Sequence, residues 1–177
     1  SAPAARRPGR RNRRRPPRSC SRRRLIPETA ARPKIIVLVG LPGSGKSAYG
    51  RRLGLPAISS DEIRRLLVDD EADQSIHGAV FATLRYLLRR RLDLRRPLTV
   101  VDATNISPRE RRTYVKIAEW YGCDLEAVCF DVPVAVCLER NRGRARVAPE
   151  EALRRMAEHL VPPSVSEGFR AVTVIRF

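Results

Sequence analysis

The sequence has few of the residues that mark secreted, metal-binding or membrane-spanning proteins. Its four cysteines form no C-x-x-C pair and its two histidines stand apart, which argues against a zinc site or a redox motif. These residues are Cys20, Cys123, Cys129 and Cys137, and His77 and His159. No stretch approaches the roughly 18 consecutive apolar residues of a membrane span, and no apolar segment of a secretory signal follows the arginine-rich start. These absences predict a cytoplasmic protein without a membrane partner.

Lysine is also scarce, with three residues against 33 arginines. Twelve of those arginines fall in residues 1–34, which are rich in proline and contain almost no apolar run. Such a segment cannot bury enough apolar surface to fold, so we predict that residues 1–33 form a basic disordered tail. Residues 1–34 carry +12 of the net charge of +17. The tail is either an electrostatic anchor for nucleic acid or an extension without a role in an arginine-biased sequence, and we favour the second interpretation.

Residues 34–177 have the pattern of one α/β domain, with a central parallel sheet of about five strands flanked by helices. Their length is enough to bury roughly two-thirds of the unfolded surface. We expect strands at residues 35–39, 57–61, 98–102, 125–132 and 171–177. We expect helices at residues 48–54, from 61 onward, and at 73–92, 108–121, 133–141 and from 149 onward. The acidic run of residues 69–73 is expected to form the N-terminus of the long helix at 73–92.

A phosphate-binding loop follows the first predicted strand directly. The segment Gly40-Leu-Pro-Gly-Ser-Gly-Lys46-Ser47 matches the Walker A pattern G-x-x-x-x-G-K-[ST]. In such a loop, glycines let successive N–H groups point at phosphate oxygens, and a helix N-terminus adds its positive dipole. Lys46 is predicted to reach the β- and γ-phosphates of ATP, and Ser47 to ligate Mg²⁺. The alternative is a glycine-rich turn that binds no ligand.

The nucleotide contacts expected of this P-loop extend over nine consecutive residues. They are Gly40, Leu41, Pro42, Gly43, Ser44, Gly45, Lys46, Ser47 and Ala48. Backbone N–H groups of a loop of this kind supply most of the contacts to the phosphates, so the prediction covers the whole segment rather than its charged member alone.

Two aspartates end predicted strands and are candidates for the reaction itself. Asp61 ends the second strand, where in P-loop kinases a carboxylate can accept the proton of an attacking hydroxyl. Arg64, one helical turn on, could hold a phosphate of the acceptor, although Asp61 could instead cap the helix and pair with Arg64. Asp102 ends the third strand and is predicted to lie beside the substrate and hold Mg²⁺ through water. Its alternative role is a hydrogen bond within the turn that follows.

Six blocks of the sequence together resemble a known family. They are GLPGSGKS, SSDEIR, DDEADQ, LTVVDATN, the arginine-rich segment Glu139–Arg146, and Glu167-Gly168-Phe169. In this order they resemble the polynucleotide 5′-hydroxyl kinases, most closely the kinase module of bacterial RNA end-healing and repair enzymes. The resemblance covers nearly everything from Lys34 to the C-terminus, and the joint spacing is more specific than the P-loop alone.

The resemblance assigns roles on both sides of the transferred phosphoryl group. It implies that Lys46 and Ser47 handle ATP and Mg²⁺, that Asp61 is the general base, and that Arg64 contacts a nucleic-acid phosphate next to the 5′ end. The chain ends where the kinase module of the larger repair enzymes would be expected to end. We therefore expect any phosphatase or ligase activity to come from separate partner polypeptides.

The resemblance also implies an arginine-rich lid that clamps ATP and contributes to catalysis. Arg140 and Arg144 match the arginines of the family's lid pattern, which begins with an Arg-Asn pair. Arg146 is carried over as a third ATP contact, although the segment here is about a residue short. Arginines that close over phosphates elsewhere are worth on the order of 10³ to 10⁵ in rate.

The resulting hypothesis is an ATP-dependent phosphotransferase that moves the γ-phosphoryl group to a 5′-hydroxyl end of RNA or DNA. One alternative is a small-molecule P-loop kinase similar to zeta-toxin, antibiotic or sugar phosphotransferases. Another is a nucleic-acid-binding ATPase without an acceptor. Arg64 together with the DDEADQ and VVDATN blocks favours the polynucleotide hypothesis.

Overall fold

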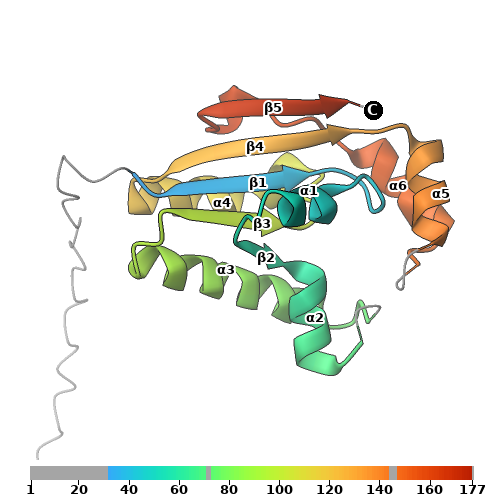
Figure 1. Ribbon diagram of the computed structural model, residues 1–177, viewed down its shortest axis with the longest axis horizontal. Helices are drawn as coiled ribbons and strands as arrows, with labels where there is room; N and C mark the ends of the chain where they lie inside the picture. The colour runs from blue at the N-terminus through green and yellow to red at the C-terminus, as the bar shows by residue number, and fades with distance from the viewer. Residues whose placement is uncertain (1–31, 71–72, 144–146, 177) are drawn as a thin grey trace, which may run out of the picture. The chain divides into compact units, whose positions relative to one another are not determined.

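The apolar segments of the sequence form one parallel sheet (Figure 1). The structure, a computed structural model, describes residues 32–70, 73–143 and 147–176. Within these residues the sheet has five strands in the order β2-β3-β1-β4-β5. They are β1 (Lys34–Val39), β2 (Ala57–Ser59), β3 (Leu98–Asp102), β4 (Asp124–Asp131) and β5 (Ala171–Arg176). The predicted α/β fold with a central parallel sheet is therefore confirmed.

Helices connect successive strands, as a parallel sheet requires. The structure places them at α1 (Lys46–Arg52), α2 (Ser60–Val68), α3 (His77–Asp93), α4 (Pro108–Tyr121), α5 (Val134–Arg142) and α6 (Glu150–His159), with a short 3₁₀ helix η1 (Val165–Glu167) before β5. No helix in the described ranges is long and apolar enough to cross a membrane. The predicted tail, residues 1–33, lies outside the described residues except for Arg32 and Pro33, so its disorder stays a prediction.

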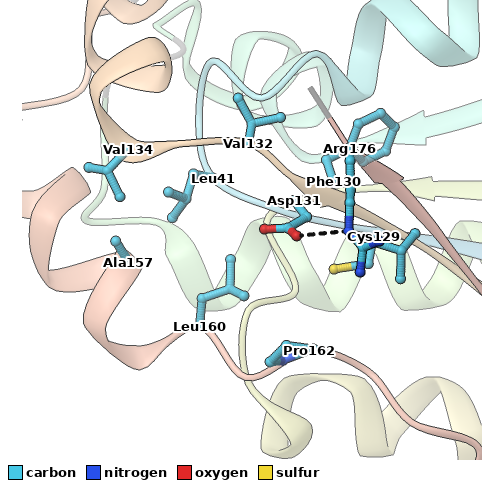
Figure 2. A pocket seen from close by; sticks show the side chains of 11 residues that line it. Leu41, Cys129, Phe130, Asp131, Val132, Val134, Ala157, Leu160, Pro162 and Arg176 are labelled. Carbon is cyan, nitrogen blue, oxygen red and sulfur yellow. Dashed lines mark ion pairs between the residues drawn. The ribbon is translucent and has the colours of Figure 1, made fainter.

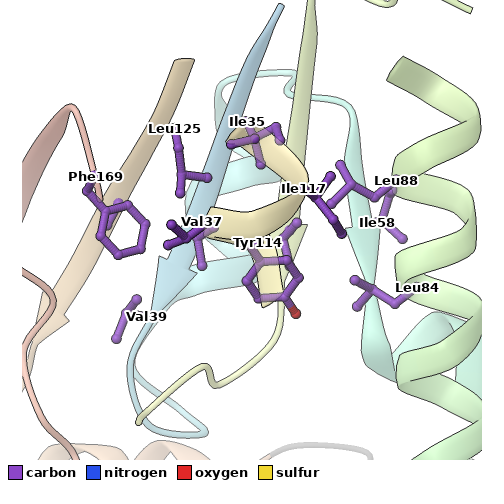
Figure 3. Packing of buried hydrophobic residues seen from close by; sticks show 14 of the residues in the cluster. Ile35, Val37, Val39, Ile58, Leu84, Leu88, Tyr114, Ile117, Leu125 and Phe169 are labelled. Carbon is purple, nitrogen blue, oxygen red and sulfur yellow. The ribbon is translucent and has the colours of Figure 1, made fainter. Parts of the chain in front are cut away.

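Each face of the sheet is covered by its own set of helices. In β1, Ile35, Val37 and Val39 point to one face, where they pack with residues of α3 and α4 (Figure 3). Ile36 and Leu38 point to the opposite face and pack with residues of α1, α5 and α6. This alternation follows from the period of two in a strand, and a strand buried on both faces reads as an unbroken apolar run.

The register brings the ends of three strands to the same level. Leu38 of β1 and Ser59 of β2 both lie opposite Asp102 of β3. The carboxyl ends of these parallel strands therefore meet at one edge of the sheet, called the carboxyl edge below. The loops that leave this edge carry the phosphate-binding loop and both candidate aspartates, and ligands of open α/β sheets bind at such an edge.

The long helix begins later than predicted, and the acidic run does not form its N-terminus. Helix α3 starts at His77 rather than Asp73, and its first turn contains no acid. Asp69 instead ends α2 in a left-handed conformation with φ of 58°, and its N–H donates to Arg65 O. The Asp73 carboxylate accepts a hydrogen bond from Ser75 N at 2.7 Å, which forms a turn before the helix. Aspartate favours such turns and caps as strongly as first helical turns.

Candidate active site

The phosphate-binding loop takes a conformation that only glycine adopts without strain at two positions. Gly43 and Gly45 have φ of 83° and 95°, in the left-handed region. A Cβ atom on Gly43 would lie 2.5 Å from the carbonyl oxygen of Cys137 in α5. Gly45 is the N-cap of α1, so Lys46 and Ser47 begin that helix. The loop thus packs directly against the backbone of α5 and leads into a helix N-terminus.

The side chain of Lys46 folds back onto the start of the P-loop. Its Nζ atom donates to Gly40 O at 2.8 Å and to Leu41 O at 2.7 Å, and its side chain is 7% exposed. Ser47 is half-buried beside it and Ala48 is exposed. The ammonium group therefore lies against the first two residues of the P-loop. A charged donor at this place suits phosphates bound by the same loop.

Asp102 lies beside the loop at the carboxyl edge. Its side chain is 6% exposed at the end of β3. Two residues later, Thr104 O accepts a hydrogen bond from Gly40 N at 3.0 Å, which joins the β3–α4 loop to the first glycine of the P-loop. The structure therefore brings Asp102 and the P-loop to one edge, and the predicted role of Asp102 near Mg²⁺ stays a prediction. Oxygen donors of this kind suit Mg²⁺, which keeps several waters and needs one or two protein ligands besides phosphates.

Asp61 and Arg64 form an ion pair within α2. Arg64 Nη1 lies 3.2 Å from Asp61 Oδ1, and the Arg64 side chain is 3% exposed. Ser59, not Asp61, caps the helix by accepting from Glu62 N at 3.4 Å. Of the alternative roles considered for these residues, the structure has the pairing but not the cap. Arg64 is buried in this arrangement. The predicted contacts of both residues with an acceptor remain predictions.

The arginine-rich segment begins at the end of α5. Arg140 is exposed on this helix, one turn beyond the Cys137 carbonyl that packs against Gly43. Arg144 and Arg146 lie outside the described residues. Asn141 precedes them in the sequence and Ala148 follows them. The buried Asn141 side chain donates to Ala148 O at 2.7 Å and accepts from Ala148 N at 3.0 Å. These two hydrogen bonds join the end of α5 to the residues before α6.

The cysteines of the described ranges lie in the hydrophobic core or pack against it. Cys123, Cys129 and Cys137 are free thiols, and burial raises the pKa of Cys129 and Cys137. His77 stacks on Phe81 in α3 with ring centroids 4.6 Å apart. No group of three or more His, Cys, Asp or Glu side chains that could hold a metal was found in the part of the chain that the structure describes. Any Mg²⁺ there would depend on phosphate oxygens for several of its ligands.

A cavity of about 330 Å³ lies next to the P-loop, between the ends of β4 and β5 and the loop after α6 (Figure 2). Its lining is mostly apolar and includes Leu41, Val132 and Leu160. An ion pair between Asp131 and Arg176, with 3.6 Å between charged atoms, borders it. Of the predicted site residues only Leu41 lines this cavity, so the predicted chemistry lies elsewhere at the carboxyl edge.

Sequence reasoning missed one buried arginine near the site. Arg111 of α4 is fully buried and forms an ion pair with Glu167, with 2.7 Å between Nη2 and Oε1. The signal was present in the helical period, because Arg111 lies on the same face as Tyr114, Val115 and Ala118, all of them buried. The charged neighbours Glu110 and Arg112 are exposed, so the local sequence gives no sign that Arg111 is buried.

A protein-family model described as an AAA domain matches residues 35–163 of the chain. This match covers β1 to the loop after α6, and so includes the P-loop, Asp61, Arg64, Asp102 and Arg140.

Several solved structures share the fold. A chain from the Pnkp1/Rnl/Hen1 RNA repair complex is 23% identical with a TM-score of 0.62, and the match covers 76% of this chain and 46% of that one. This chain thus spans about half the length of its counterpart in the repair complex. A gluconokinase from Sinorhizobium meliloti is 22% identical with a TM-score of 0.52, covering 83% and 84% of the two chains. Kti12 from Chaetomium thermophilum, solved with ADP-AlF3, is 17% identical with a TM-score of 0.56, covering 81% and 89%. At these identities the likeness shows the fold alone, a parallel sheet flanked by helices.

Proposed function

Because the chain belongs to the AAA domain family, we propose that it is an ATP-dependent phosphotransferase whose acceptor is a 5′-hydroxyl end of RNA or DNA. The observation that carries this proposal is the meeting of three elements at the carboxyl edge. The P-loop leaves β1, the aspartate at position 61 lies in the first turn after β2, and Asp102 ends β3 opposite Ser59 and Leu38. In this proposal a donor site and a carboxylate for the acceptor hydroxyl would share one edge.

The donor half of the site would hold the triphosphate of ATP. Backbone N–H groups of Gly40–Ala48 would bind phosphate oxygens, and Lys46 would exchange its present carbonyl acceptors for the β- and γ-phosphates. Ser47 and, through water, Asp102 would hold Mg²⁺, which neutralises phosphate charge when bound. Arg140 of α5, with Arg144 and Arg146 that follow it in the sequence, would bind the same phosphates.

The acceptor half would centre on α2. Asp61 would accept the proton of the attacking hydroxyl, and a carboxylate of ordinary basicity suffices because the transition state is loose. Arg64 would contact a phosphate next to the 5′ end. Since Arg64 is now buried against Asp61, that contact requires its side chain to turn outward. Arginine suits this role because its planar guanidinium can hold a phosphate and a carboxylate at once.

Two features support a polynucleotide acceptor. The SSDEIR, DDEADQ and VVDATN blocks resemble the polynucleotide kinases, and the fold is shared with a chain of an RNA repair complex. A small-molecule hydroxyl is the rival acceptor, because the likeness to a gluconokinase runs along most of both chains. If the acceptor is an RNA end, separate phosphatase and ligase proteins would be its functional partners.

The fate of labelled γ-phosphate separates these possibilities. ATP carrying the label would be incubated with the protein and either a 5′-hydroxyl oligonucleotide, the same oligonucleotide with a 5′-phosphate, or a small-metabolite extract. The proposal predicts transfer to the 5′-hydroxyl oligonucleotide alone. Transfer to a metabolite would support the small-molecule alternative, and release to water alone would support an ATPase. Asp61→Asn serves as the matched control for contaminating kinases.

A further inference from the structure

Arg111 is a fully buried charged side chain whose hydrogen bonds join three separate segments. Its Nε and Nη2 atoms donate to the two carboxylate oxygens of Glu167 at 2.9 and 2.7 Å. Its Nη1 atom donates to the backbone oxygens of Asn105 and Val161 at 2.9 and 3.0 Å. One guanidinium thus ties α4 to η1, to the loop after α6 and to the loop after β3.

The loop after β3 in turn holds the start of the P-loop. Asn105 has φ of 48°, and its buried side chain, 1% exposed, donates from Nδ2 to Leu38 O at 2.8 Å and to Ala103 O at 3.3 Å. Its neighbour Thr104 accepts from Gly40 N. A left-handed residue other than glycine is held in place only where its surroundings fix it. Here the fixing contacts come from Arg111 on one side and from β1 on the other.

The same loop begins at the candidate Mg²⁺ residue. Asp102 is three residues before Asn105, and Ile106, the residue after, accepts through its carbonyl from Val161 N at 2.9 Å. Every described hydrogen bond from this loop to Arg111 or Val161 therefore constrains the backbone between Asp102 and α4. A shift of that backbone would move the carboxylate and the first P-loop glycine together.

Stability alone is a weak reason for this arrangement. Removing two charges from water is costly, and replacing a buried ion pair by apolar side chains of similar volume is often neutral or stabilising. A buried pair with the geometry of Arg111 and Glu167 instead defines one arrangement of the groups that it contacts. Phosphoryl transfer depends on such definition, since positioning and charge neutralisation supply nearly all of the catalysis.

We infer that Arg111, oriented by Glu167, is a positioning residue for phosphoryl transfer. It acts through the Asn105 backbone, which sets Asp102 and Gly40 in their places relative to one another. This inference rests on the proposed phosphotransfer. It concerns the donor half of the site, so it predicts effects on ATP that do not depend on the acceptor.

A conservative substitution tests the geometry. Arg111→Lys keeps the charge beside Glu167 but loses the fork of donors that reaches Asn105 and Val161. We expect kcat to fall by about 10- to 100-fold and the Kd for Mg²⁺-ATP, measured by calorimetry, to rise at least about threefold. The KM for the acceptor should stay unchanged. Arg109→Lys, exposed on the same helix, is the matched control and should behave as the unmodified protein.

A double substitution separates positioning from folding. Arg111→Met with Glu167→Leu removes both charges together and leaves neither ion without its partner. We expect this variant to be folded, with a circular dichroism spectrum and a cooperative melting transition like those of the unmodified protein. We also expect it to have the reduced kcat and weakened ATP binding of Arg111→Lys, measured per folded molecule.

Wild-type kcat and ATP affinity per folded molecule in either variant would overturn the inference. Activity lost only in proportion to the folded fraction would also overturn it, because a structural role predicts that result. If the unmodified protein binds ATP but transfers phosphate to no acceptor, the proposed function fails, and weakened ATP binding in both variants would still support the positioning role. An unmodified protein that binds no ATP would overturn both.

Discussion

The Lys46 side chain donates hydrogen bonds to two backbone carbonyls of the phosphate-binding loop. Phosphates entering the loop would compete with Gly40 O and Leu41 O for the same ammonium group. Asp61, by contrast, lies on α2, where it pairs with Arg64. Under the proposed function the two residues would serve different substrates, so their substitution should produce different kinetic effects.

Substitutions of Lys46 and Asp61 test this division of labour. Lys46→Ala should weaken ATP binding by about tenfold or more, since it removes a charge-assisted contact to phosphate. Asp61→Asn should leave ATP affinity nearly unchanged and lower kcat by at least about 10²-fold, the usual contribution of a general base. Calorimetry with ATP and steady-state kinetics give the two values. Full turnover in Asp61→Asn would rule out the base assignment.

Arg64 and Arg140 are expected to act on opposite substrates. Arg64→Ala should raise the KM for the 5′-hydroxyl oligonucleotide much more than the KM for ATP. Arg140→Ala should raise the KM for ATP or lower kcat, because its side chain is exposed on α5 one turn beyond the Cys137 carbonyl that meets Gly43. Arg65→Ala, exposed beside Arg64, is the control and should change neither KM.

An unchanged oligonucleotide KM in Arg64→Ala would return Arg64 to a purely structural pairing with Asp61. That role would show instead as a loss of stability, since removing one partner leaves the carboxylate of a partly buried pair without its counterion. A thermal melt of the same variant distinguishes the two results.

At the level of elements, the P-loop and α5 are in direct backbone contact. The carbonyl of Cys137 occupies the space that a side chain on Gly43 would need. Because α5 also carries Arg140, this contact places the P-loop next to the helix of an arginine that is proposed to bind ATP. The contact is short, so a single methyl group is enough to disturb it.

Two glycine substitutions measure this contact. Gly43→Ala should weaken ATP binding and lower the melting temperature, because its Cβ would lie 2.5 Å from Cys137 O and φ is 83°. Gly50→Ala in α1 meets no atom within 4 Å and should be neutral or stabilising by up to about 1 kcal/mol. Calorimetry and thermal melts report both effects. ATP binding in Gly43→Ala equal to that in Gly50→Ala would contradict the role given to the contact.

The elements differ in how well their sequence predicts them. The prediction for β3 matches Leu98–Asp102 and that for α4 matches Pro108–Tyr121, because an apolar run and a capping box with proline at the first turn mark their limits. The start of α3 was predicted wrongly, since the acids at 69–73 suit a helix N-terminus and a turn equally well. Local signals locate elements, but they do not choose between two structures that satisfy the same residues.

At the level of the whole molecule, the sequence predicted that the P-loop and two aspartates come at the ends of strands. It did not predict the contacts that hold the carboxyl edge. The P-loop and the strand-end aspartates could be placed there because parallel strands end at a common edge. The pairing of Arg111 with Glu167 joins residues 56 apart in the sequence. Neither residue carries a local signal for the other, so this support for the site became visible only in the fold.

Charge is distributed unevenly along the chain, with most of the net positive charge in residues 1–34. We predict that a protein without residues 1–33 keeps its fold and its activity at low salt, because no motif block lies there. Fluorescence anisotropy with an oligonucleotide across a salt series tests whether these residues bind. Each lost phosphate contact would flatten the slope of log K against log salt by about 0.7 for single strands.

We expect the salt slope to change little on this deletion. A decrease of about two units would correspond to roughly three lost contacts and would make the segment a nucleic-acid anchor. Loss of activity at low salt would show instead that the domain begins before residue 34.

The position of the transferred phosphate tests directly whether the protein phosphorylates a 5′-hydroxyl end of RNA or DNA. An RNA and a DNA strand, each with a 5′-hydroxyl and a blocked 3′ end, would be incubated with γ-labelled ATP and then digested to 5′-mononucleotides. We expect the label only in the nucleotide from the 5′ end of at least one strand, and none with Asp61→Asn. Label that stays in ATP and free phosphate with both strands would contradict this expectation.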